Sequence, residues 1–154
     1  MEGIPLISES YKPTNSLFAI RRPKIPSGAK YYFNNENGLV YQVSFGKKKN
    51  NYFGNLINFS VISDDYEDEY SETNKGEVWK IISTIIEVIR IYHEYHPHSR
   101  SYEFSGEFKK GEIQIGSSIR TRMFLRALMK VIDFKFWKVS LEENKVILLR
   151  KKND

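Results

Sequence analysis

Residues 74–95 read NKGEVWKIISTIIEVIRIYHEY, and this stretch decides the fold. Asn74 is a favourable helix cap, and Glu77, three positions later, completes a pair that resembles a capping box. From Val78 onward almost every position is apolar. At about 100° per residue, the polar side chains fall on one narrow strip. They are Lys80, Ser83, Glu87, Arg90 and Glu94. We therefore predict a helix that is covered on most sides and lies across a sheet, at the centre of the core.

The residues before this helix predict three strands. A first strand starts at Tyr31, and Asn37-Gly38 is a strong signal for a hairpin turn. The next segment alternates apolar and polar side chains, as a half-buried strand does. Its apolar positions are Leu39, Tyr41, Val43 and Phe45. A third strand is predicted from the apolar positions Phe53, Ile57, Phe59 and Val61.

The residues after the helix predict a short strand and a second helix. The pair His96-Pro97 should end the first helix, because the residue before a proline disfavours the helical conformation. Residues 102–105 are expected to form the short strand. Ser117 or Ser118 is expected to cap the second helix, which should run to about Ile132.

The chain closes with a predicted hairpin of residues 134–141 and 145–149. Three strands, helix, strand, helix and two strands predict an α+β fold, in which an antiparallel or mixed sheet of about five to six strands has two helices packed on one face. Residues 1–28 hold four of the five prolines, so we expect an irregular N-terminal arm there. Residues 29–154 should form a single α+β domain.

The composition excludes several classes of function. The chain has no cysteine, which excludes disulfides, thiolate catalysis and cysteine-bound zinc. It has no run of about 18 apolar residues that could cross a membrane. The first residues also lack the basic and then apolar pattern of a signal peptide. We therefore expect a cytoplasmic protein with no membrane partner, and we expect neither a cofactor nor a metal.

The charge is unevenly distributed along the chain. The net charge is +5, but Asp64–Glu72, DDYEDEYSE, holds six acids and no base. Outside this acidic loop, 24 basic residues face 13 acidic ones, which gives +11. The acidic loop lacks the spacing and glycine of a calcium loop. It can be a solvated loop, a cover for the protein's own basic surface, a cation site or a mimic of nucleic acid.

The second helix is the basic part of the chain. Between residues 112 and 133 there are four basic residues and no acid. Arg122, Arg126 and Lys130 follow the spacing i, i+4, i+8, so they should form one outward stripe opposite the apolar side. This stripe is either a surface that meets an anionic partner, nucleic acid or protein, or a solvated helix face.

The start of the same helix allows two interpretations. The Ser117 and Ser118 hydroxyls, the free N–H groups and Arg120 could hold a phosphate at the positive end of the helix dipole. Alternatively, a serine caps the helix. Arg120 lies toward the apolar side, so it needs a partner. That partner is Glu103 or the acidic loop in a structural role, or a ligand anion in a functional one.

The histidines do not identify a catalytic centre. His93, His96 and His98 are the only three in the chain, and they lie at the end of the first helix. Charged histidine is favourable at a helix carboxyl end, whereas a metal site would need ligands from other segments. The sequence shows no set of nucleophile, base and orienting group. We therefore lean away from an enzyme.

Two segments resemble a known group of proteins. Residues 73–86, TNKGEVWKIISTII, and residues 116–124, GSSIRTRMF, resemble small proteins of tailed phages and Bacteroidetes-type bacteria. That group has an Asn-Gly turn with an acid, a helix with a Thr-Val pair, a Tyr-Pro exit and a Gly-Ser-Thr loop before Arg-Thr-Arg-Leu-Tyr. Here Ile85 replaces the valine, His96 the tyrosine before proline, and Phe124 the last tyrosine. The resemblance implies a phage or mobile element acting in a host cytoplasm, more than a particular chemistry.

Three functional hypotheses follow. The first is a non-enzymatic binding protein of phage or mobile-element type that meets an anionic partner through the basic helix, acting on a host factor, a nucleic acid or a phage assembly. The second is an enzyme or receptor for a phosphate-bearing small molecule at residues 117–120. The third is a virion or assembly component, which would require a homo-oligomer.

Overall fold

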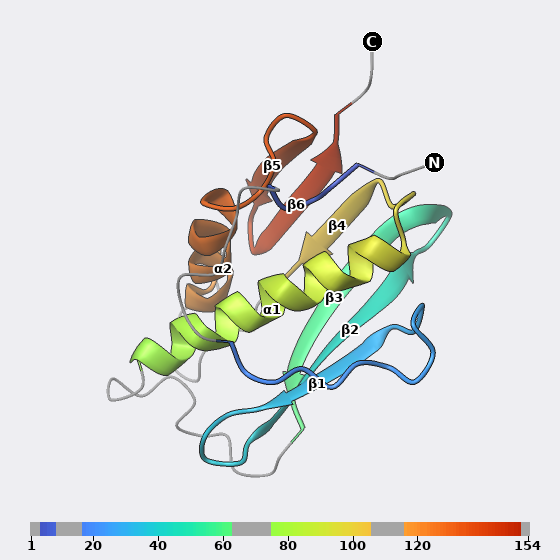
Figure 1. The fold of residues 1–154 in the computed structure, drawn as a ribbon. Coiled ribbons are helices and arrows are strands. Elements are labelled where there is room, and N and C mark those ends of the chain that lie inside the picture. Colours follow the sequence, from blue (N-terminus) through green and yellow to red (C-terminus); the bar gives the residue numbers. More distant parts are fainter. Residues whose placement is uncertain (1–3, 9–16, 63–74, 106–115, 152–154) are drawn as a thin grey trace.

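The computed structural model describes residues 4–8, 17–62, 75–105 and 116–151, which form a six-stranded mixed sheet with two helices (Figure 1). The strand order across the sheet is β1-β2-β3-β4-β6-β5. The elements are β1 (Lys30–Asn34), β2 (Val40–Lys48), β3 (Asn51–Val61), α1 (Lys75–Tyr95), β4 (Ser101–Phe104), α2 (Ile119–Met129), β5 (Trp137–Glu142) and β6 (Lys145–Arg150). The expected α+β fold is confirmed.

The β1–β2 hairpin forms at the predicted Asn-Gly pair. Gly38 has φ +84°, a left-handed value that side chains disfavour. The buried Asn35 side chain accepts hydrogen bonds from the backbone N–H groups of Asn37 and Leu39. This turn sets the register of the two strands, so that the aromatic side chains of both enter the core.

A parallel pair makes the sheet mixed. β3 and β4 run parallel, with Gly54 opposite Ser101 and Ile57 opposite Phe104, and α1 is the crossover between them. β4 also pairs antiparallel with β6. This central position explains why all four residues of β4 are buried.

Helix α1 has the predicted polar strip. Between Ile81 and Tyr92, every residue is buried except Ser83, Glu87 and Arg90. The helix ends at Tyr95, directly before the His-Pro pair. The proposed cap, Asn74, lies outside the described residues. The sequence therefore predicted both the exposed face and the end of α1.

One polar side chain on the buried side of α1 is fully paired. The Thr84 hydroxyl donates to the Lys80 carbonyl (2.8 Å) and accepts from the Phe18 N–H (3.1 Å). The N-terminal part of the chain is thereby tied to α1 at a buried position.

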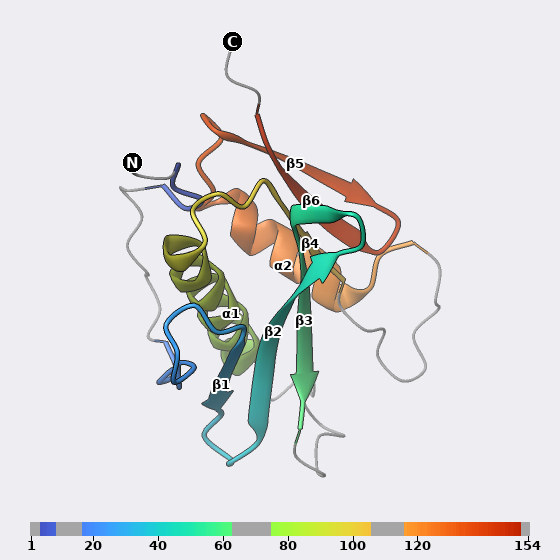
Figure 2. The same ribbon diagram turned by 90° about the vertical axis from the view of Figure 1, so that its right-hand side faces the viewer.

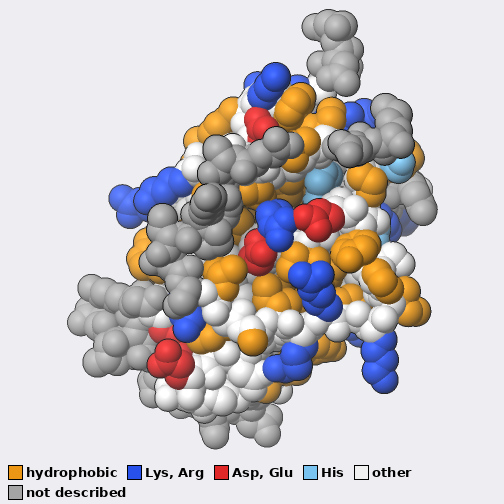
Figure 3. Space-filling view, viewed as in Figure 1, with side chains coloured by type: hydrophobic (Ala, Val, Ile, Leu, Met, Phe, Trp, Pro, Cys, Tyr) orange, Lys and Arg blue, Asp and Glu red, His pale blue; other side chains and the backbone are white. Residues whose placement is uncertain are grey.

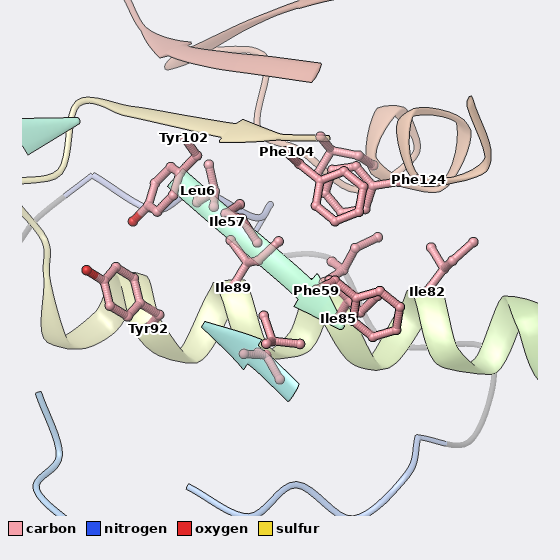
Figure 4. Close-up of a cluster of buried hydrophobic side chains, with 14 of the residues drawn as sticks. Leu6, Ile57, Phe59, Ile82, Ile85, Ile89, Tyr92, Tyr102, Phe104 and Phe124 are labelled. Carbon is pink, nitrogen blue, oxygen red and sulfur yellow. The ribbon is translucent and has the colours of Figure 1, made fainter. Parts of the chain in front are cut away.

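Both helices pack on one face of the sheet, as predicted (Figures 1 and 2). Phe124 of α2 stacks on Phe104 of β4, with ring centroids 4.1 Å apart. Figure 4 shows these rings close to Ile82 and Ile85 of α1 and to Phe59 of β3. The two helices and the sheet therefore share one core.

Two element ends differ from the prediction by three residues, whereas the others that were predicted by number differ by one residue or less. Helix α2 ends at Met129, three residues earlier than expected, and β5 begins at Trp137, three residues later. Between them the chain turns, and the Asp133 side chain accepts the Lys135 N–H (3.0 Å). Such a side-chain hydrogen bond competes with regular backbone pairing. The spacing of apolar residues, from which the elements were predicted, does not indicate it.

The N-terminal segment 4–8 is held against the second half of the chain. The Leu6 carbonyl accepts the Asp133 N–H (3.0 Å), and the Trp137 indole donates to the Pro5 carbonyl (2.9 Å). Leu6 is only 1% exposed. This part of the predicted arm therefore belongs to the core. Neither of the two described helices is long and apolar enough to cross a membrane.

Candidate anion-binding surface

Ser118 acts as the N-cap of α2. Its hydroxyl accepts the Thr121 N–H (3.1 Å) and donates to the Thr121 hydroxyl (3.0 Å), while its own N–H donates to the Asn144 side chain (2.6 Å). Ser118 and Thr121 are both fully buried. The structure thus supports the capping interpretation for Ser118, because its hydroxyl and its N–H are already engaged by the protein.

Ser117 is tied to the first basic residue of the stripe. The Arg122 guanidinium donates to the Ser117 carbonyl and lies 3.4 Å from its hydroxyl. This contact holds Arg122 against the start of the helix, although its side chain stays exposed. The structure therefore brings Ser117 together with Arg122, which was not part of the predicted phosphate site, whereas Ser118 of that site is buried.

Arg120 lies on the apolar side of α2, as predicted. It is half-buried, and its guanidinium carbon is 5.7 Å from the centroid of the Phe59 ring, a cation–π distance. The expected structural partner, Glu103, instead pairs with Lys48 (2.7 Å) and Lys145 (3.5 Å). The other expected partner, the acidic loop, lies outside the described residues.

The ion pairs with Lys48 and Lys145 also explain why the Glu103 carboxyl is ionised. Burial acts to raise the pKa of this carboxyl, but the hydrogen bond and charge of Lys48, together with Lys145, bring the pKa below its ordinary value. Glu103 is therefore a charged, structurally engaged carboxylate in the middle of the sheet.

The predicted basic stripe is exposed. Arg122, Arg126 and Lys130 are all exposed on α2, while Thr121, Phe124 and Leu128 on its other side are buried. Within the described part of the chain, none of these three basic side chains forms an ion pair with a carboxylate. We refer to Arg122, Arg126 and Lys130 as the basic ridge.

Helix α1 offers a contrast. Arg90 is held by Glu87 (2.7 Å) and by Glu94, and the hydrogen bond with Glu87 raises its pKa. Figure 3 shows blue and red side chains together over α1, whereas blue side chains project at the left-hand edge, where α2 lies. The charge of Arg90 is thus neutralised within α1, whereas no described carboxylate pairs with the basic ridge.

Two apolar residues, one at the end of α2 and one shortly after it, are exposed although the sequence did not predict them as part of a site. Met129 is 46% exposed and Phe134 is 43% exposed. Met129 follows Arg126 at i+3, so it shares the exposed face of α2. The same helical spacing that identified the ridge would have identified Met129. The exposed face of α2 therefore carries an apolar side chain, Met129, besides the basic ridge.

His93 and His96 belong to the protein's own packing, whereas His98 is exposed. His93 is buried between the Tyr102 hydroxyl (2.6 Å) and the Ile4 carbonyl (2.7 Å). His96 stacks on Tyr92 with ring centroids 3.8 Å apart. Among the described residues, no three His, Asp or Glu side chains are grouped to hold a metal.

If a histidine were to act on a phosphate-bearing ligand at residues 117–120, Arg120 and that histidine would have to converge. The structure places them in different surroundings, since Arg120 lies over Phe59 and His93 contacts Tyr102. Tyr102 and Phe59 occupy different parts of the core in Figure 4. This geometry does not favour acid–base catalysis by His93 on a ligand held at Arg120.

Comparison with known proteins identifies no relative: no family model, no curated protein and no solved structure matches the chain. The function of this chain must therefore be inferred from its own residues and their geometry.

Proposed function

We propose that this chain is a binding protein that meets an anionic partner, either a nucleic acid or an acidic protein surface, through the basic ridge of α2. One observation carries the proposal. Arg122, Arg126 and Lys130 are exposed on one face of a helix whose other face is anchored in the core, and no described carboxylate neutralises them.

A rigid helix is a suitable support for such a surface. Phe124 and Leu128 are buried, and the Ser118 cap is bonded to Asn144 in the turn between β5 and β6. The guanidinium groups of arginine match phosphate and carboxylate oxygens in bidentate hydrogen bonds. Our proposal for this surface is binding without catalysis. The phage or mobile-element setting in a host cytoplasm is part of this proposal and rests on the resemblance in sequence.

The test measures affinity as a function of salt. Wild-type protein and the variant Arg122→Gln, Arg126→Gln, Lys130→Gln are titrated against duplex DNA of about 20 base pairs and against a poly-glutamate peptide. If three phosphates are neutralised, the logarithm of the DNA association constant should fall against the logarithm of salt concentration with a slope of about −2.7. The variant should bind at least one probe more weakly, with a slope closer to zero.

A matched control separates the ridge from net charge. Arg22, Lys24 and Lys49 are exposed residues outside α2, and their triple glutamine variant loses the same charge. It should keep most of the affinity. Equal weakening by both variants, or no salt-dependent binding of the wild type to either probe, would show that the proposal is wrong.

A further inference from the structure

The two edge strands of the sheet, β1 and β5, differ in the backbone hydrogen bonds on their outer side. At one edge, β1 is covered, because Arg21 and Tyr32 exchange two backbone hydrogen bonds of 2.7 and 3.1 Å. At the other edge, β5 pairs with β6 on its inner side, and no described strand pairs with its outer side. Figure 2 shows β5 as the outermost strand. An open edge is a template for another strand.

The turn after β5 identifies the backbone groups that point outward. Glu142 pairs with Lys145 across a two-residue turn, and such a turn is closed by a hydrogen-bonded pair. Hydrogen-bonded and non-hydrogen-bonded positions alternate along an antiparallel ladder. Val139 and Leu141 therefore direct their N–H and C=O groups away from β6. Trp137 would do the same, but its N–H already donates to the Asp133 carbonyl (3.1 Å).

The side chains of β5 have a self-complementary order. Lys138 and Glu142 are both exposed and lie on the face opposite the helices. Val139 and Leu141 lie on the helix face, opposite buried residues of β6, and Leu141 is 41% exposed. β5 thus has a basic residue near its start, an acid at its end and two apolar residues between them. When a second copy of the strand runs in the opposite direction, its acid can lie opposite this basic residue.

We propose that β5 pairs antiparallel with β5 of a second copy of this chain, with Ser140 of the two copies opposite each other on a two-fold axis. In this register Val139 of one copy exchanges backbone hydrogen bonds with Leu141 of the other. Lys138 then lies opposite Glu142, and opposite charges at such positions are favourable. The same two contacts occur twice because the interface is isologous.

Other registers that keep the faces matched are less suitable. Because side chains alternate between the two faces of a strand, the register can shift only in steps of two residues. One shift requires the N–H of Trp137, which is already bonded to Asp133. The opposite shift requires Glu143, which is part of the turn and has φ +53°. Both shifts also separate Lys138 from Glu142.

The pairing has a consequence for the arrangement of the helices. A two-fold axis between antiparallel edge strands is perpendicular to the sheet, so the helices of both copies lie on the same face. The sheet becomes continuous through the two copies. The two α2 helices, each beside the β6 side of its own sheet, then present two basic ridges on one side of the dimer.

An exposed lysine on an edge strand also has a simpler role, which is to prevent strand association. Charge exchange distinguishes the two roles. Lys138→Glu alone, or Glu142→Lys alone, places like charges opposite each other in the dimer, whereas the double exchange restores opposite charges. A lysine that only guards the edge gives no such rescue.

The experiment measures self-association of the full chain by analytical ultracentrifugation, without any anionic partner, up to roughly millimolar concentration. The wild type should form a dimer. Each single reversal should raise the dissociation constant about tenfold or more, because two attractive cross-strand pairs become repulsive. The double exchange should return it to within about threefold of the wild type.

A backbone variant provides a second test. Val139→Pro removes an outward N–H, which the dimer needs and the β5–β6 ladder does not, so it should abolish the dimer. A wild type that stays monomeric, a dimer that is insensitive to single reversals, or a double exchange that is no tighter than the single variants would overturn the proposal. Because these measurements contain no DNA or peptide, their outcome is independent of the basic ridge.

Discussion

Replacing His93 by glutamine should remove a pH-dependent part of the protein's stability. The His93 ring is 5% exposed, and its Nε2 atom lies 2.7 Å from the Ile4 carbonyl oxygen. Because a carbonyl only accepts, Nε2 carries the proton, and Nδ1 accepts from the Tyr102 hydroxyl at 2.6 Å. Burial lowers the pKa of His93, the hydrogen bond to Ile4 opposes this, and the charge of Arg150 lowers the pKa further. The folded protein thus favours a neutral ring.

The sign of the effect follows from proton linkage. In the unfolded chain the histidine takes up a proton near pH 6.5, whereas the folded protein does so only at lower pH. The unfolded state therefore binds more protons in this window, and stability falls as the pH decreases below about 6.5. The loss between pH 7.5 and pH 5.5 is at most about 1.4 kcal/mol, which is the limit for a ring that stays neutral in the folded protein throughout this range.

Urea unfolding at these two pH values tests the argument. The wild type should lose up to about 1.4 kcal/mol more than His93→Gln, because glutamine keeps some hydrogen-bonding capacity but takes up no proton. His98→Gln is the control, since His98 is exposed and its replacement leaves His93 in place. Its pH dependence should parallel that of the wild type. The same pH dependence in wild type and His93→Gln would refute the assignment of a buried neutral ring.

Two further substitutions test the turns and caps that position the surfaces. Ser118→Ala should lower the free energy of unfolding by about 1–2 kcal/mol, because Ser118 is a buried N-cap, whereas Ser117→Ala should lower it by less than about 0.5 kcal/mol. Gly38→Ala should cost about 1 kcal/mol because of the positive φ of Gly38, while Gly46→Ala, which has open space and no positive φ, should be neutral or slightly stabilising. Equal effects within either pair, measured by denaturant unfolding, would contradict the reasoning.

Local patterns explain what could be predicted. The exposed strip of α1 depends only on the spacing of Ser83, Glu87 and Arg90 among apolar residues, and the first hairpin depends on the conformational freedom of Gly38. The exposure of the basic ridge follows from the same helical periodicity. These features depend on residues a few positions apart, so the sequence contains their cause.

Long-range contacts explain what could not be predicted. The role of Ser118 depends on Asn144, which is 26 residues away, and the tautomer of the His93 ring depends on the Ile4 carbonyl, which is 89 residues away. Glu103 of β4 contacts Lys48 and Lys145 only when β2 and β6 lie in the same sheet as β4. No periodicity identifies such partners, because each pair meets only through the strand order.

By itself, the amino-acid sequence determined the number and type of the main elements, the buried side of α1 and the outward stripe of α2, since each follows from side-chain spacing along a short segment. The tertiary structure decided the parallel pairing of β3 with β4, the burial of the segment around Leu6 and the position of β5 at the end of the strand order. These depend on the free energy of packing whole elements together, and many strand orders are compatible with the same local pattern.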